Sequence, residues 1–155
     1  MDVKQFIDSL IPAAMESMKN DGIPASFTIA QAALESAWGS SKLAVQGFNL
    51  FGVKAGKSWK GDILVLPTTE FIDGKEVKVQ AKWRKYESLD QCIKDHTAFL
   101  KNNPRYAPAF IHKCNGDQFA HYIAAGGYAT DPHYAKKLQS IIYSNHLLAL
   151  DAEEG

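Results

Sequence analysis

An excess of charge of one sign is missing from this chain of 155 residues. Lysine and arginine together number 17, aspartate and glutamate also number 17, and the formal net charge is zero. Proteins that bind nucleic acid without sequence specificity are normally basic, because their cationic side chains neutralise the phosphates. The balance of charges argues against a general nucleic-acid binder, and we expect no nucleic-acid partner.

Cysteine is scarce, and long apolar runs are absent. The two cysteines, Cys92 and Cys114, are too few for a disulfide-stapled scaffold. They could pair or remain free thiols, and both alternatives stay open at this point. No stretch approaches the roughly 18 apolar residues of a membrane span, so we expect no membrane insertion.

The N-terminus has no apolar run long enough for the core of a signal peptide, since Asp2 and Asp8 interrupt it. We therefore expect synthesis in the cytoplasm, with delivery by another route if the chain acts elsewhere. Hydrophobic residues make up 46% of the chain, an ordinary value for a globular domain that buries its own core. The length predicts one domain, over residues 1–150, followed by a short tail at 151–155.

Most of the chain has the periodicity of helices. Apolar residues recur at helical spacing from Val3 to Lys19, where Pro12 either kinks the helix or starts a second one. The segment 24–38 is rich in alanine and nearly apolar on all sides, which is typical of a helix in the middle of a domain. Further helical patterns include residues 89–100 and the segment that follows Asp131-Pro132.

Two apolar runs predict a β-hairpin, since 63–72 and 75–84 flank Asp73-Gly74, a strong hairpin signal. A two-residue turn would place Glu70 opposite Val77, and therefore on the same face of the hairpin. A carboxylate on that face suggests a cleft, although a slip of one residue would reverse the argument. Together the elements predict an α+β fold, mostly α, with one small hairpin lobe.

Glu35 is the one charged residue between Ala25 and Ser41. It could lie on an exposed stripe of its helix. Alternatively it could form the floor of a cleft, against Trp38 and small residues. In a cleft, desolvation would raise the pKa of its carboxyl, as a general acid requires near neutral pH.

The ten residues from Ala30 to Gly39, Ala-Gln-Ala-Ala-Leu-Glu-Ser-Ala-Trp-Gly, resemble the signature of the bacterial glucosaminidase family, glycoside hydrolase family 73. The resemblance covers roughly Phe6 to Leu148. Ala37 departs from it, because many members carry glycine there. The other matching elements, in the expected order, are Asn49–Lys54, Ser58–Gly61, Thr68–Phe71, Asn103–Tyr106 and Gly127–Ala135.

The resemblance implies a lysozyme-like fold in which the hairpin flanks the active-site cleft. It also implies cleavage of β-1,4 bonds in peptidoglycan without a cofactor, most often by an endo-β-N-acetylglucosaminidase. Glu35 takes the place of the catalytic acid, and Glu70 matches the hairpin glutamate. Tyr128 is favoured as the catalytic tyrosine because it lies in a loop. Tyr134 precedes Leu138 at helical spacing and is expected mainly to pack.

Further side chains are candidates for binding the sugar. The amides of Gln31 and Asn49 could orient a water or an acetamido group, or only satisfy the backbone, and aromatic faces stack on sugar rings. The candidate substrate-binding residues are Gln31, Trp38, Asn49, Phe51, Trp59, Tyr106 and Tyr134.

Cys92 and His96 have a spacing that could hold a metal, but they lie on an apolar helix face. Core packing is the favoured interpretation, so we expect neither metal nor cofactor.

Several alternatives stay open. Glu70 could activate water, or it could stabilise positive charge while the acetamido group of the substrate attacks. The same fold could act as a lytic transglycosylase or a muramidase, or the chain could be a non-catalytic peptidoglycan-binding or phage tail module. We expect a monomer that acts on glycan strands of the cell wall or periplasm, delivered through a phage holin or a delivery machine.

Overall fold

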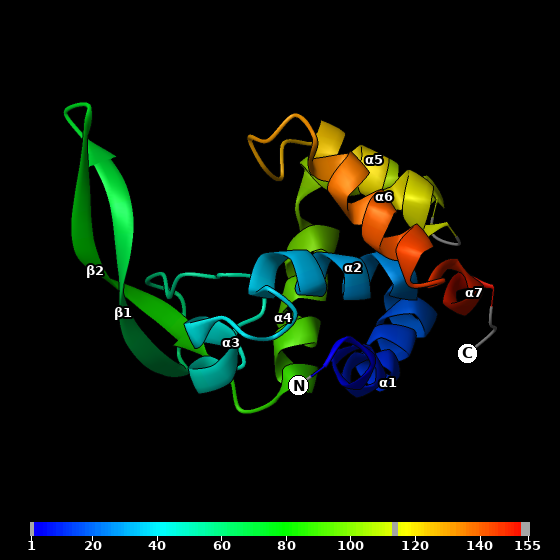
Figure 1. Ribbon diagram of the computed structural model, residues 1–155, viewed down its shortest axis with the longest axis horizontal. Helices are drawn as coiled ribbons and strands as arrows, with labels where there is room; N and C mark the ends of the chain where they lie inside the picture. Colours follow the sequence, from blue (N-terminus) through cyan, green and yellow to red (C-terminus); the bar gives the residue numbers. More distant parts are fainter. Residues whose placement is uncertain (1, 113–114, 153–155) are drawn as a thin grey trace.

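The computed structural model describes residues 2–112 and 115–152. Helices form the body, and one antiparallel pair of strands stands apart from it (Figure 1). This architecture confirms the predicted α+β fold with a small hairpin lobe. The elements are α1 Val3–Asp21, α2 Ala25–Ser36, α3 Lys42–Gly47, β1 Asp62–Ile72, β2 Lys75–Lys85, α4 Leu89–Asn102, the 3-10 helix η1 Pro104–His112, α5 Gly116–Ala125, α6 Tyr134–Ser144 and α7 Leu148–Asp151.

Helix α2 occupies the middle of the helical body, as its apolar composition predicts. Every residue from Ala25 to Ala33 is buried, because α1, α5, α6 and α7 all pack against this helix. Asp151 is the last residue of α7 and is also buried. Its carboxylate accepts hydrogen bonds from the backbone N–H groups of Ser26 (2.9 Å) and Gly116 (2.8 Å). An acidic side chain thereby joins the N-termini of α2 and α5, where helix dipoles favour negative charge.

Helix α1 runs unbroken through Pro12. Proline removes one backbone hydrogen bond, to the carbonyl of the residue four positions earlier. Here that residue is Asp8, and both Asp8 and Pro12 are exposed. Water can therefore satisfy the freed carbonyl, and the helix neither ends nor restarts.

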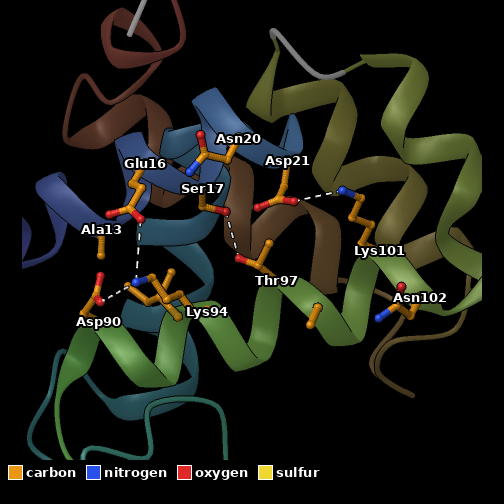
Figure 2. A pocket seen from close by; sticks show the side chains of 12 residues that line it. Ala13, Glu16, Ser17, Asn20, Asp21, Asp90, Lys94, Thr97, Lys101 and Asn102 are labelled. Carbon is orange, nitrogen blue, oxygen red and sulfur yellow. Dashed lines mark hydrogen bonds and ion pairs between the residues drawn. The ribbon is translucent and has the colours of Figure 1, made fainter.

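A groove of about 430 Å³ lies on the surface where α1 and α4 meet, and Figure 2 shows the polar contacts between the two helices. Lys101 pairs with Asp21 at 2.9 Å. Deeper in the interface the hydroxyls of Ser17 and Thr97 share a buried hydrogen bond of 2.8 Å. These contacts tie α4 to α1 and leave the opposite face of α4 to the site described below.

The hairpin has the predicted register. Ile72 opposes Lys75 and Glu70 opposes Val77 across an Asp73-Gly74 turn. Alternate residues of β1 are half-buried, and Glu70 lies on that less exposed face. The base of the hairpin is anchored by a bridge between Lys54 and Trp83.

Cys92 is buried in α4. Burial raises the pKa of its thiol to about 12, so it packs as a small apolar side chain. Cys114 lies outside the described residues, and so does any pairing between the two cysteines.

The end of α2 has an unusual backbone. Ala37 and Trp38 both have positive φ, at 49° and 57°, and Gly39 follows at 81°. The left-handed region is disfavoured for residues with a Cβ. At Gly39 a Cβ would also approach the Phe6 ring to 2.9 Å. The chain therefore turns sharply immediately after Glu35.

Replacing Ala37 by glycine should stabilise the protein by about 1 kcal/mol, because glycine adopts the left-handed conformation without steric cost. Ala37 is exposed, so no packing is lost. Thermal unfolding should show a melting temperature higher by about 2–4 °C. The matched control is Ala98→Gly at an exposed position inside α4, which should lower it. A melting temperature that falls in both variants would contradict backbone strain at Ala37.

Candidate active site

A cavity of about 350 Å³ opens beside the C-terminal end of α2. Glu35 lies on its wall, together with the aromatic rings of Phe51, Tyr106 and Tyr128. The lining therefore combines the carboxyl of Glu35, and that of Asp95 from α4, with aromatic rings. A few polar groups among apolar side chains are typical of a ligand-binding cleft.

Glu35 is the point at which the buried helix α2 reaches solvent. Its Oε1 accepts a hydrogen bond of 3.0 Å from the hydroxyl of Tyr134. Desolvation by the surrounding protein raises the pKa of the Glu35 carboxyl, and the Tyr134 hydrogen bond opposes this in part. A carboxyl group with a raised pKa retains its proton closer to neutral pH, as a general acid must.

Tyr134 is buried at the start of α6. The sequence assigned it mainly to packing, and the structure adds that its hydroxyl donates to Glu35. The same hydroxyl accepts a hydrogen bond of 3.0 Å from Nε2 of Gln31. Tyr134 thus connects the carboxyl in the cleft to a polar group inside the core.

Gln31 is fully buried, and its side chain forms hydrogen bonds with two other side chains, those of Tyr134 and His96. Its Oε1 lies 2.6 Å from Nε2 of His96 on α4. His96 is itself buried, and burial lowers the pKa of its imidazole to about 3. The ring of Phe51 stacks on that imidazole, with 3.7 Å between the ring centroids. His96 is therefore neutral and belongs to the wall of the cavity.

Tyr128 lies in the loop between α5 and α6 and faces the cavity. Its ring stacks on Tyr134, with 5.6 Å between centroids and 17° between planes. Gly126 brings this loop close to η1, because a Cβ there would lie 2.8 Å from the carbonyl oxygen of Arg105. A larger residue at position 126 would therefore force this loop and η1 apart.

Glu70 is not among the residues that line this cavity. It lies far along the hairpin, where its carboxylate pairs with Lys54 at 3.0 Å. Glu35 and Glu70 are therefore on separate structural elements, and the hairpin holds Glu70 outside the cavity beside Glu35.

Five of the seven candidate sugar-binding residues are also absent from the lining of this cavity. Two of them, Gln31 and Tyr134, lie behind Glu35 as described above, and the other three are Asn49, Trp38 and Trp59. Asn49 is buried and clamps a loop, donating to the carbonyls of Val53 and Arg84, both at 2.9 Å. Trp38 packs edge-on against Phe6 and lines a different cavity. Trp59 donates to the carbonyl of Asp62 at the base of the hairpin.

The sequence did not indicate an ion pair that lines the cleft. Arg84 of β2 and Asp95 of α4 pair at 2.7 Å, and the Tyr86 hydroxyl donates to the same carboxylate at 2.6 Å. These contacts join the hairpin to the helical body. The two residues are eleven positions apart, on different elements. The sequence showed one charge at the base of the hairpin and another on a partly buried helix, and it gave no sign that the two would pair.

Within residues 2–112 and 115–152, no three histidine, cysteine, aspartate or glutamate side chains cluster as metal ligands would. Nor does any helix in these ranges have the length and apolarity that crossing a bilayer demands.

The fold and the motifs have known relatives. The family model Glucosaminidase, described as mannosyl-glycoprotein endo-beta-N-acetylglucosaminidase, matches residues 11–147. Peptidoglycan hydrolase FlgJ of Escherichia coli strain K12 is 41% identical over 145 residues, covering 91% of this chain and 46% of that protein. Exo-glucosaminidase LytG of Bacillus subtilis is 39% identical over 142 residues, covering 88% and 49%. The chain thus spans about half the length of these curated relatives.

A solved structure gives the same result in three dimensions. The C-terminally truncated glycoside hydrolase domain of Salmonella typhimurium FlgJ superimposes with a TM-score of 0.80 at 40% identity, covering 94% of this chain and 98% of that one. The family predicted from the motifs around Glu35 is therefore confirmed, and the chain belongs to the glucosaminidase family, glycoside hydrolase family 73.

Proposed function

We propose that this domain hydrolyses β-1,4 bonds in the glycan strands of peptidoglycan, as an endo-β-N-acetylglucosaminidase with Glu35 as general acid. The observation that carries the proposal is the placement of Glu35. It is the single charged residue of α2, at the end of this buried helix, and it faces a cavity whose lining includes aromatic rings. The names of its relatives, a peptidoglycan hydrolase and a glucosaminidase, indicate the substrate class.

In the proposed reaction the glycan lies in the cavity with the oxygen of the scissile bond against Glu35. Because its pKa is raised, the carboxyl retains a proton and transfers it to that leaving oxygen. Positive charge then develops on the sugar ring to one side of the broken bond. The half-buried ring of Tyr128 on the cavity wall can contact the sugar, whereas Phe51 and Tyr106 are buried and form part of the wall.

Glu70 is the second carboxylate of the proposed reaction. It acts on the glycan from the hairpin, of which Arg84 lines the cavity and Glu70 does not. As a base it would activate water on the face of the sugar opposite Glu35, which requires a separation of roughly 6.5–9.5 Å between the carboxyls. If instead the acetamido group of the substrate attacks, Glu70 only stabilises positive charge.

Tyr128 contacts the sugar in this proposal. Its ring is held by stacking on Tyr134 while it lines the cavity. Burial raises the pKa of its hydroxyl, so the group stays protonated and can donate a hydrogen bond. A donor at this position can orient a sugar substituent next to the bond that Glu35 protonates.

The Glu35→Gln variant should lose hydrolysis by a factor on the order of 10²–10⁴, because glutamine keeps the shape of the side chain but has no acidic proton to transfer. Loss of turbidity in a peptidoglycan suspension measures the rate, and thermal melting verifies the fold. Glu16→Gln on the exposed face of α1 is the control and should behave as wild type. A Glu35→Gln variant that retains most of its activity would disprove the assignment.

The pH dependence tests Glu70. Activity should fall at alkaline pH as Glu35 loses its proton, at a midpoint above that of an ordinary glutamate because its pKa is raised. It should also fall at acid pH as the second carboxylate becomes protonated. Glu70→Gln should remove the acid limb or most of the rate. Glu76→Gln, on the opposite face of the hairpin, should change neither. An unchanged profile in Glu70→Gln would show that attack by the acetamido group needs no help from the hairpin.

The Tyr128→Phe substitution should slow turnover several-fold with little change in melting temperature, because it removes a donor to the substrate and keeps the stacked ring. Tyr143→Phe at an exposed position of α6 serves as the control. Rates on peptidoglycan beside melting curves give the answer. Equal rates for Tyr128→Phe and wild type would remove Tyr128 from the site.

A further inference from the structure

We propose that Gln31 and His96 are positioning residues that fix the direction of the hydrogen bond between Tyr134 and Glu35. Their buried contacts hold the Tyr134 hydroxyl as a donor to Oε1 of Glu35. The proton that Glu35 transfers must then be carried on Oε2. This inference rests on the proposed function, in which Glu35 is the general acid.

The first step is the state of His96. The imidazole is buried on α4, stacked on Phe51 with 10° between the ring planes. Its Nε2 lies 2.6 Å from Oε1 of Gln31. An amide oxygen can only accept a hydrogen bond, so Nε2 must carry a proton. Burial keeps the imidazole neutral, and the contact with Gln31 therefore selects one tautomer.

The second step concerns the hydrogen bond that Gln31 donates to Tyr134. Because Oε1 of Gln31 is occupied by His96, the NH₂ group of the amide faces Tyr134 and donates to its hydroxyl oxygen at 3.0 Å. Gln31 is fully buried, so no water competes for the amide. The hydroxyl of Tyr134 has a single proton, and its neighbour in the other direction is Oε1 of Glu35 at 3.0 Å.

The third step concerns the acid itself. With Tyr134 donating, Oε1 of Glu35 is an acceptor in both protonation states of the carboxyl. The neutral acid then has its proton on Oε2, which Tyr134 does not occupy. Were the tyrosine free to rotate, Glu35 could donate to it instead, and the acid would be held in an unproductive hydrogen bond.

Other charged or titratable groups share the cavity with Glu35. Helix α4 contributes Asp95 and His96, β2 contributes Arg84, η1 contributes Arg105 and Tyr106, and the α5–α6 loop contributes Tyr128. Arg84 and Asp95 pair with each other. All of these except His96 are unchanged in the variants below, so a shift in the titration of Glu35 reports on the hydrogen-bonded chain.

The test compares Gln31→Leu and His96→Phe with wild type. Each replaces a polar side chain by an apolar one of similar size and so removes one link of the hydrogen-bonded chain. Loss of an oriented donor destabilises the ionised form of Glu35, so its pKa should rise further. Carbon-13 NMR of the labelled Glu35 carboxyl, assigned with Glu35→Gln, should show a midpoint higher by about half a pH unit or more. On soluble peptidoglycan fragments, kcat should fall roughly three- to tenfold with KM unchanged, because the proton is misplaced while the sugar contacts remain.

Two matched variants separate positioning from stability. His96→Gln retains an N–H donor near the place of the imidazole Nε2, and it should recover the midpoint and kcat toward wild type relative to His96→Phe. Thr97→Val removes the buried hydrogen bond to Ser17 on the other side of α4 (Figure 2). It should lower the melting temperature and leave the Glu35 titration unchanged.

The positioning role would be overturned if the midpoint of the Glu35 titration and kcat were both unchanged in Gln31→Leu and in His96→Phe. A shift in Thr97→Val equal to theirs would also overturn it, since the effect would then be loss of stability. If Glu35→Gln is active, the proposed general acid fails as well. If it is inactive while Gln31→Leu and His96→Phe titrate as wild type, only the present inference fails.

Discussion

The burial of α2 is the constraint on which the site depends. A helix that is buried from Ala25 to Ala33 has no solvent-exposed position for a charged residue except near its end. Glu35 occupies that end, and the left-handed turn at Ala37 and Trp38 then takes the chain away. The carboxyl is consequently held at the end of a buried helix, at the boundary between core and cleft, where partial desolvation raises its pKa.

The core also contributes polar groups to the site. The chain of contacts from His96 through Gln31 to Tyr134 runs entirely among buried side chains. Such a network is costly when any member lacks a partner, and it specifies one arrangement when all are satisfied. The arrangement ends on Glu35. The packing of α6 against α2 and the contact of His96 on α4 with Gln31 on α2 therefore determine how the Glu35 carboxyl faces the cleft.

Local signals in the sequence predicted most of the elements and marked Glu35 as the candidate acid. The Asp73-Gly74 turn determines the hairpin register, because a two-residue turn leaves one pairing open to the flanking strands. A single charge in an alanine-rich helix marked Glu35. The partners of Glu35 could not be predicted in the same way, because Tyr134 is 99 residues away and His96 is 65 residues from Gln31. Trp38 was assigned to the cleft by proximity to Glu35, but the turn after α2 directs it to another cavity.

Digestion of peptidoglycan in water enriched in oxygen-18, followed by mass spectrometry of the soluble fragments, tests the proposed chemistry most directly. Protonation by Glu35 and attack by water predict fragments that end in a reducing N-acetylglucosamine carrying one heavy oxygen at C1, and none of these fragments from Glu35→Gln. Unlabelled anhydro sugars would show transglycosylation instead of hydrolysis. Labelled N-acetylmuramic acid ends would contradict the assignment as a glucosaminidase.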